Sequence, residues 1–477
     1  MIVKKYKFYK SKPSAMKRII LILLLLPFTS VTFAQRNYAQ ELVNLMQQGR
    51  CFDAREFRMQ YSDKLPSNDK ALDLLYKFHM ALFFNKSDSA AIYLENVFSN
   101  RDYELKMGPG IGTYYGRLFK LYGDEQRFKD GINSCDKFLD YLNRNPFDLE
   151  PDFIQKEINY VENIKSSFKN REMNEPRIRI VRKECSENDI IELNNSKYIY
   201  IDARYNDVAV QTWFDTGVTA YFMMTRSLAD KIGTKKSVSD QDSIQMVNGK
   251  PRKVVLEIID SINLKNVQLY NIPVLVFEEN FHSHLPATLD NETKLNIERI
   301  FSDNQIVMGL PAIKRIGKIE LDWEKSTISF PNNTEHMRSN DFSNIFIIKD
   351  NPYLKLRVNG LSYVGYLDSG ADDFLTLTTS FYEKNKDNIE IDSVENKEPL
   401  HHHTMTGSTF NIPYEYVKDV KIYTNGRLVN YDMERVIIVD KFSHINIFDG
   451  VVGLNFIKKL GKKIVFDFDN MRVEAIN

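Results

Sequence analysis

The sequence predicts an α+β multidomain protein, in which an all-α N-terminal region is followed by a duplicated, mostly-β unit. Three observations lead to this class. Between about residues 37 and 169, apolar residues recur at helical spacing. From residue 197 onward, short runs typical of strands alternate with turn residues. The second region also contains one series of motifs twice, which indicates an internal repeat.

The size and charge of the chain limit the functions to consider. With 477 residues, of which 43% are hydrophobic, it can form two to four domains with their own cores. Its 64 basic and 64 acidic residues give a formal net charge of zero, so we expect no nucleic-acid partner. The three cysteines are too few for a disulfide framework, although one disulfide is compatible with the sequence.

Residues 1–34 have the features of a signal peptide. Basic residues precede an apolar run from Ile19 to Leu26, and Thr32-Phe33-Ala34 provides small residues at the positions that a signal peptidase recognises. The apolar run is far shorter than the roughly 20 residues of a membrane span. We therefore expect cleavage near Ala34 and an exported protein, periplasmic or secreted, with no membrane span in the mature chain.

Residues 35–170 are predicted to form helical hairpins. Apolar residues with helical periodicity are interrupted by breakers such as Pro66, Pro109-Gly110 and Pro146. The pattern resembles a tetratricopeptide-like repeat with an irregular period. Two interpretations stay open: a structural cap or spacer, or a docking surface for a protein partner. Residues 171–195 are predicted to be a polar linker that contains one strand, Arg177–Arg182.

The repeated motifs are centred on two short turns. Asp215-Thr216-Gly217 and Asp368-Ser369-Gly370 each follow two apolar residues. Farther along, each turn is followed by an apolar-apolar-Gly segment, ending at Gly309 or at Gly453, and then by a short helical segment. One Asp-Ser/Thr-Gly triplet alone would mark an ordinary turn. Two long segments with the same order of motifs indicate a duplication.

These motifs resemble the two-lobed aspartic proteases of the pepsin and retropepsin-like kind. The resemblance spans about residues 177–477 and implies a duplicated acid protease unit, with lobe 1 at 196–335 and lobe 2 at 344–477. It also implies that the strand Arg177–Arg182 joins a sheet that bridges the lobes. The polar stretch from Pro331 to Ser343 is expected to connect the lobes.

The resemblance implies that Asp215 and Asp368 are the catalytic residues of an aspartic endopeptidase, a hydrolase that needs no cofactor. Two carboxyl groups that share one proton can activate a water and polarise the peptide carbonyl. The substrate would be a peptide or a protein. The residues expected to support the catalytic loops are Thr216 and Ser369, through cross-lobe hydrogen bonds, and Gly217 and Gly370, through close backbone approach.

The residues after the two turns differ from those of pepsin-like enzymes, which usually have Ser or Thr there. Here they are Val218 and Ala371. A hydroxyl that donates to a carboxylate favours its ionised form, so its absence raises the pKa of the carboxyl. We expect activity in weakly acidic to near-neutral conditions.

Substrate-binding candidates lie in two predicted hairpins and beside the second turn. The hairpins are centred on Val247–Lys250, which contains Gly249, and on Thr404–Thr409, which contains Gly407. They are candidate flaps that would exclude water from the substrate. The resemblance adds Asp372 and Asp373, which match positions that hold the substrate backbone in retroviral relatives; ordinary surface charges are the other interpretation.

The segment His401-His402-His403 does not predict a metal site. In a strand, only His401 and His403 would face the same side. Two ligands without a third make a poor zinc site, so we expect no metal there.

Two alternatives to an active protease stay open. One is a catalytically silent peptide-binding protein of the same fold. The other is a partner-docking protein that acts through its helical region. The presence of both Asp215 and Asp368 favours catalysis, because a silent relative is free to lose either residue.

Overall fold

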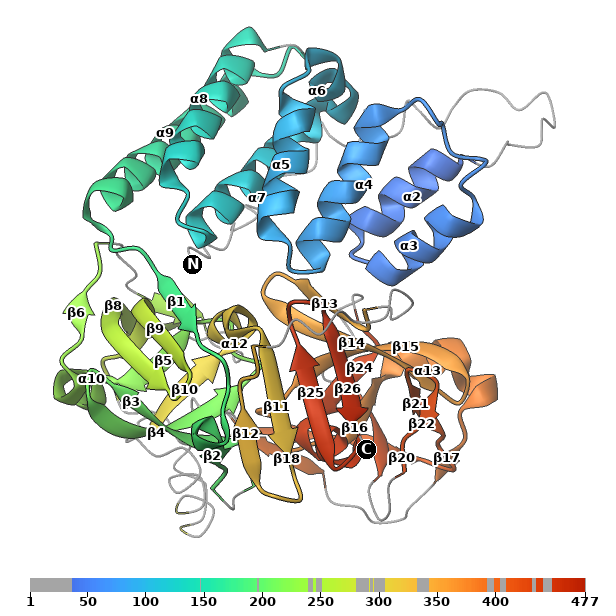
Figure 1. Ribbon diagram of the computed structural model, residues 1–477. Helices are drawn as coiled ribbons and strands as arrows, with labels where there is room; N and C mark the ends of the chain where they lie inside the picture. Colours follow the sequence, from blue (N-terminus) through green and yellow to red (C-terminus); the bar gives the residue numbers. More distant parts are fainter. Residues whose placement is uncertain are drawn as a thin grey trace. The chain divides into compact units, whose positions relative to one another are not determined.

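The computed structural model describes residues 37–476 except 146, 195–196, 239–242, 246–250, 280–290, 292–294, 296–304, 333–342, 393–398, 404–408, 431–434 and 441–447 (Figure 1). The chain divides into two compact units, residues 1–70 and 71–477. The predicted signal peptide and most of the predicted connection between the lobes lie outside the described residues.

In the first unit, helices α2 (Tyr38–Gln47) and α3 (Cys51–Gln60) pack together. Helix α2 begins after Asn37, whose side-chain oxygen accepts a hydrogen bond of 3.0 Å from a backbone amide of the first turn. Leu42 on α2 and Phe57 on α3 are buried.

The second unit begins with further helices, which confirms the prediction of an all-helical region. They are α4 (Lys70–Phe83), α5 (Ser87–Phe98), α6 (Arg101–Met107), η1 (Gly108–Gly110), α7 (Ile111–Asp124), α8 (Phe128–Arg144) and α9 (Pro151–Asn174). Their core is aromatic: the Tyr115 ring stacks between Phe98, at 3.9 Å between centroids, and Phe138, at 4.4 Å. Helix α9 approaches α8 closely at Gly131, where a Cβ atom would lie 2.5 Å from the Phe168 ring.

A nine-stranded sheet follows the helices. Its members are β1 (Arg179–Arg182), β3 (Tyr200–Tyr205), β4 (Val208–Asp215), β5 (Phe222–Thr225), β6 (Lys235–Lys236), β7 (Ser243–Gln245), β8 (Pro251–Leu264), β9 (Val267–Phe277) and β10 (Gln305–Gly309). Pairing of β8 with β9 closes six strands, in the order β9-β5-β10-β4-β3-β8, into a barrel. Helix α10 (Arg226–Ile232) ends at Gly233, which has a left-handed backbone.

The strand predicted at Arg177–Arg182 exists as β1, but its predicted place was wrong. It pairs antiparallel with β9 at the edge of the nine-stranded sheet. The sheet that joins the two halves instead receives β2 (Ile191–Glu192) from this part of the chain, and β2 pairs there with β12 (Thr327–Ser329). Alternation of side chains identifies a strand but does not identify its partner.

The second half contains a ten-stranded sheet. Its members are β13 (Ile345–Ile348), β14 (Asn351–Val358), β15 (Leu361–Asp368), β16 (Leu375–Thr378), β17 (Ile391–Asp392), β20 (Tyr414–Val417), β21 (Ile422–Thr424), β22 (Arg427–Leu428), β23 (Val436–Val439) and β24 (Gly450–Gly453). The order β23-β16-β24-β15-β14-β21 corresponds strand by strand to the order in the first sheet. Helices α13 (Thr379–Asn385) and η3 (Lys386–Asn388) lie between β16 and β17 in the chain. Helix α14 (Leu454–Lys459) follows β24.

A five-stranded sheet joins the two halves. It has the order β2-β12-β11-β25-β26, where β11 is Lys318–Asp322, β12 is Thr327–Ser329, β25 is Lys463–Asp467 and β26 is Arg472–Ile476. Strands β11 and β25 pair antiparallel, with Leu321 opposite Ile464. Helix α12 (Leu310–Ile316) precedes β11 and is followed by Gly317.

The helical region of the second unit contacts both halves of the β-rich part. Arg315 on α12 donates to the backbone carbonyl of Asp124 at 2.7 Å and to the carboxylate of Glu125 at 3.0 Å. Asp350, in the turn between β13 and β14, forms ion pairs with Lys120 at 3.1 Å and with Lys314 at 3.7 Å. The helical region is therefore anchored by polar contacts and is not tethered by the predicted linker alone.

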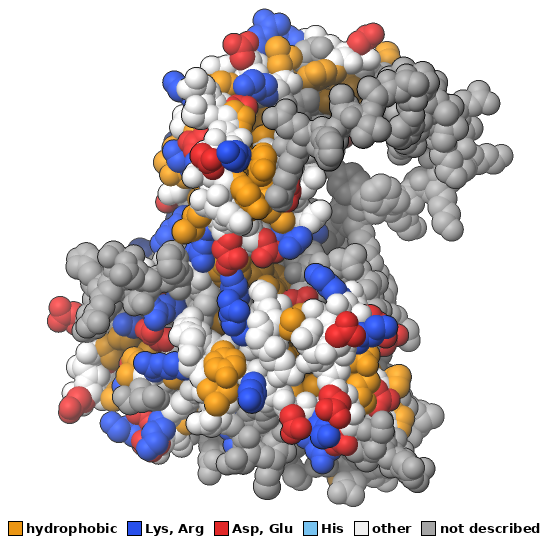
Figure 2. All heavy atoms as spheres, turned by 90° about the vertical axis from the view of Figure 1, so that its right-hand side faces the viewer, with side chains coloured by type: hydrophobic (Ala, Val, Ile, Leu, Met, Phe, Trp, Pro, Cys, Tyr) orange, Lys and Arg blue, Asp and Glu red, His pale blue; other side chains and the backbone are white. Residues whose placement is uncertain are grey.

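Basic and acidic side chains are intermingled on the face shown in Figure 2, where neither sign forms a continuous patch. None of the described helices combines the length and the apolar character that crossing a membrane requires.

Candidate active site

The two aspartates stand at the ends of corresponding strands. Strand β4 ends at Asp215 and pairs in parallel with β10, which places Gly309 opposite Asp215. Strand β15 ends at Asp368 and pairs in parallel with β24, which places Gly453 opposite Asp368. A glycine is needed at Gly309, because a Cβ atom there would lie 2.6 Å from the carbonyl oxygen of Val218, in the loop that follows Asp215.

The two turns meet face to face, and each glycine faces the carboxyl group of the other turn. A Cβ atom on Gly217 would lie 2.5 Å from Asp368 Oδ1, and one on Gly370 would lie 2.5 Å from Asp215 Oδ1. Side chains Asp215 and Asp368 are within hydrogen-bonding reach of each other. The structure thus brings together the two aspartates that the sequence analysis singled out, although they lie far apart in the chain.

Buried hydrogen bonds between the two halves hold the turns together. The Ser369 hydroxyl accepts from the Thr216 amide at 3.0 Å and donates to the Phe214 carbonyl at 3.2 Å. In the same way, the Thr216 hydroxyl accepts from the Ser369 amide at 2.9 Å and donates to the Leu367 carbonyl at 2.8 Å. Thr216 and Ser369 are fully buried, so both hydroxyls are completely satisfied within the protein.

Burial raises the pKa of Asp215 well above its ordinary value, and the neighbouring charge of Asp368 raises it further. The Gly217 amide donates to Asp215 Oδ1 at 2.8 Å and partly opposes this shift, because it stabilises the ionised form. The equivalent bond from Gly370 to Asp368 Oδ1 is 3.0 Å long. The environment therefore favours a pair of carboxyl groups that retains one proton.

The other candidate substrate-binding residues are only partly described. Strand β7 pairs with β8, and β18 (Leu400–His403) pairs with β19 (Thr409–Ile412), which confirms both predicted hairpins. Their tips, with Gly249 and Gly407, lie outside the described residues.

The acidic pair beside the second turn is described. The Asp372 carboxylate forms an ion pair with Lys197 from the first half. Asn455 binds the backbone carbonyl of Asp372 at 2.6 Å. Asp373 follows in the same loop, and its backbone carbonyl lies against Gly453.

Two tyrosines near the dyad were not singled out from the sequence. Burial raises the pKa of Tyr198, and so do the nearby charges of Asp372, Asp215 and Asp368. The buried Tyr366 hydroxyl donates to the Gly217 carbonyl at 3.0 Å. Its pKa is also raised by burial, so it remains a donor at physiological pH. Tyr366 lies two residues before Asp368, but nothing in its type or spacing indicates that its hydroxyl crosses to the other turn.

Within the described part of the chain, no group of three or more His, Cys, Asp or Glu side chains is arranged to hold a metal ion. The side chains of His401–His403 lie outside the described part. Cys51, Cys135 and Cys185 are free thiols.

The raised pKa of Asp215 predicts a pH-dependent effect on stability. The folded protein holds the proton more tightly than the unfolded chain, whose Asp pKa is about 3.9. The resulting stabilisation is complete below that pKa and is lost as the pH rises through the folded-state pKa. Asp215→Asn should therefore raise the melting temperature more at neutral than at acidic pH.

Thermal unfolding of both proteins across this range measures the effect. Asp202→Asn, which removes an exposed carboxyl group from β3, is the control. An equal difference in melting temperature at both pH values would contradict the assigned shift.

Comparison with known proteins bears on the first of the two turns. Residues 201–294, which include Asp215 but not Asp368, match the family model described as aspartyl protease. A search of curated proteins found no match. Among solved structures, the chain is similar to a retropepsin-like aspartic protease from Rickettsia conorii, with 18% identity over 29% of this chain and 81% of that one, and a TM-score of 0.19. The chain therefore contains an aspartyl protease domain at residues 201–294, preceded by an N-terminal helical region.

Proposed function

We propose that this protein is an exported aspartic endopeptidase that hydrolyses peptide bonds with a water activated by Asp215 and Asp368. The observation that carries the proposal is the close pair of carboxyl groups, with Asp215 buried and Asp368 partly buried, whose turns are held together by reciprocal bonds between Thr216 and Ser369. Two like charges so close together and removed from water would be costly if they served stability alone. Such a pair is chemically useful when it shares a proton.

In the proposed mechanism, the ionised carboxyl group accepts a proton from water as the oxygen attacks the peptide carbonyl. The protonated carboxyl group donates to the carbonyl oxygen, which develops negative charge. Proton transfer to the nitrogen then releases the amine. Gly217 and Gly370 allow the two carboxyl groups to approach this closely, because neither carries a side chain.

Export is proposed from the sequence of residues 1–34, with cleavage near Ala34 and a periplasmic or secreted destination. A peptide or protein substrate follows from the chemistry of the pair, which requires neither a metal nor a cofactor.

The test is incubation of the purified mature protein with a diverse peptide library from acidic to neutral pH, beside Asp215→Asn. We expect cleavage by the wild type only. The optimum should be weakly acidic to near neutral, because Val218 and Ala371 provide no hydroxyl to stabilise the ionised pair. Peptide binding without cleavage by the wild type would instead support the silent peptide-binding alternative.

A further inference from the structure

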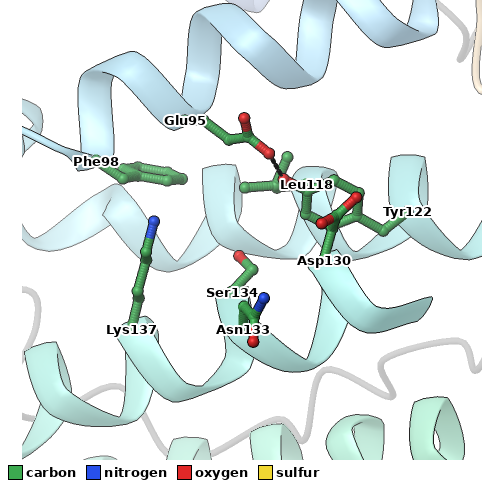
Figure 3. A pocket seen from close by; sticks show the side chains of 8 residues that line it. All are labelled: Glu95, Phe98, Leu118, Tyr122, Asp130, Asn133, Ser134 and Lys137. Carbon is green, nitrogen blue, oxygen red and sulfur yellow. Dashed lines mark hydrogen bonds between the residues drawn. The ribbon is translucent and has the colours of Figure 1, made fainter. Parts of the chain in front are cut away.

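A small cavity lies within the helical region, far along the chain from the proposed catalytic residues. Helices α5, α7 and α8 line this cavity, which has a volume of about 170 Å³ and is open to solvent on one side (Figure 3). Its lining consists of Glu95, Phe98, Leu118, Tyr122, Asp130, Asn133, Ser134 and Lys137. One end of this cavity is acidic and the other contains a lysine, so the two ends differ in the ligands that they can bind.

The acidic end already has partners within the protein. The Tyr122 hydroxyl donates to the Glu95 carboxylate. Arg127 forms an ion pair of 2.7 Å with Asp130, and its guanidinium lies 5.0 Å from the centre of the Tyr122 ring. Because Glu95 and Asp130 are satisfied, this end does not require a cationic ligand.

The other end presents donors without acceptors. Ser134 is only 4% exposed, yet its hydroxyl has no hydrogen-bond partner among the described residues, although a helical serine can bond to the carbonyl four residues earlier. Asn133 and Lys137, one turn apart on α8, are exposed to solvent at the mouth of the cavity, and neither has a side-chain partner in the described part of the chain. Figure 3 shows the Ser134 hydroxyl and the Lys137 ammonium directed into the cavity below Phe98.

An unpartnered buried hydroxyl destabilises the folded protein, so its position needs an explanation. A ligand that accepts hydrogen bonds would satisfy Ser134, Asn133 and Lys137 together. One ammonium group balances one negative charge. A dianion such as phosphate would be repelled by Glu95 and Asp130 at the other end of the cavity. These charges favour a monoanion.

The apolar walls restrict the ligand further. Phe98 and Leu118 line the same cavity. A ligand that has a short apolar side chain next to its anionic group would therefore fit. We propose that this cavity binds a peptide carboxylate, held by Lys137 and Ser134, with its neighbouring side chain against Phe98. The carboxylate can come from a C-terminus or from an Asp or Glu side chain, and the experiment distinguishes these sources. The site is independent of the proposed hydrolysis.

Calorimetric titration of the full mature protein tests the proposal, in an Asp215→Asn background so that no probe is cleaved. The probes are acetyl-Ala-Ala-Leu with a free carboxylate, the same peptide as its amide, and acetyl-Ala-Asp-Leu amide. The free acid should bind at least tenfold more tightly than the first amide. Equally tight binding of the Asp-containing amide would identify a side-chain carboxylate as the source, and its failure to bind would identify a C-terminus.

Substitutions in the cavity provide the second measurement. Lys137→Gln should weaken binding of the free acid by roughly tenfold or more. Ser134→Ala should also weaken it, while leaving the melting temperature unchanged or higher, because it removes an unsatisfied hydroxyl. Lys129→Gln, which removes another exposed lysine of the same helix that lies outside the lining, is the matched control and should have no effect. The proposal is overturned if the acid and both amides fail to bind at about 1 mM, if the acid and the first amide bind alike, or if Lys137→Gln binds the acid normally.

Discussion

Asp215→Asn and Asp368→Asn should each reduce peptide hydrolysis by roughly 10⁴-fold or more, and the double variant should lose little beyond either single change. The reason is that the two carboxyl groups act as a unit, in which one holds the proton that the other lacks. Removing either leaves no group to take the complementary role. Turnover of a peptide selected from the library measures the loss in all three variants.

The matched control for these variants is Asp202→Asn, which removes an exposed carboxyl group of the same sheet and should retain normal turnover. If Asp368→Asn retained near-normal cleavage, or if the losses of the single variants multiplied in the double variant, the shared-proton mechanism would be wrong.

Gly370→Ala should reduce kcat/KM for peptide hydrolysis by roughly 100-fold or more, although it removes no titratable group. The added methyl group would lie 2.5 Å from Asp215 Cγ, so the two carboxyl groups would have to separate. The backbone of Gly370 does not have a positive φ, so the substitution acts through this contact and not through backbone strain.

Gly116→Ala separates this contact from a general effect of adding a methyl group. Gly116 lies on α7, where the new Cβ atom would have no atom within 4 Å apart from its chain neighbours and the adjacent backbone of the helix, and alanine favours a helix over glycine by about 0.5–1 kcal/mol. Gly116→Ala should therefore be as active as the wild type and at least as stable. Normal activity of a folded Gly370→Ala variant would show that the close approach of the loops is dispensable.

The centre of the site could be predicted from the sequence because each of its elements is encoded within a short segment. These elements are a strand, the three-residue turn that follows it, and the apolar segment whose glycine lies opposite the aspartate. Because the same series occurs twice, it relates Asp215 to Asp368. The hydroxyls of Thr216 and Ser369 were expected across the interface from the resemblance, and the structure has them there.

Features that depend on contacts between distant segments were not predicted. Tyr366 reaches Gly217 across 149 positions, and Asp350 meets Lys120 from another part of the chain. The sheet that receives β1 was wrongly predicted for the same reason, since its alternating side chains fit either sheet. The cavity around Ser134 was also missed, because a serine on the buried face of a helix usually satisfies itself locally.

The five-stranded sheet that joins the halves has a consequence for how the protein is made. Its strands come from both ends of the β-rich part: β2 is near its beginning, and β25 and β26 are the last described strands. Until β25 has been synthesised, β11 presents an unpaired edge, which invites association with other chains. The sheet cannot fix the two halves against each other before that moment, so the proposed catalytic pair assembles late. A chaperone that holds the first half until then would protect this edge.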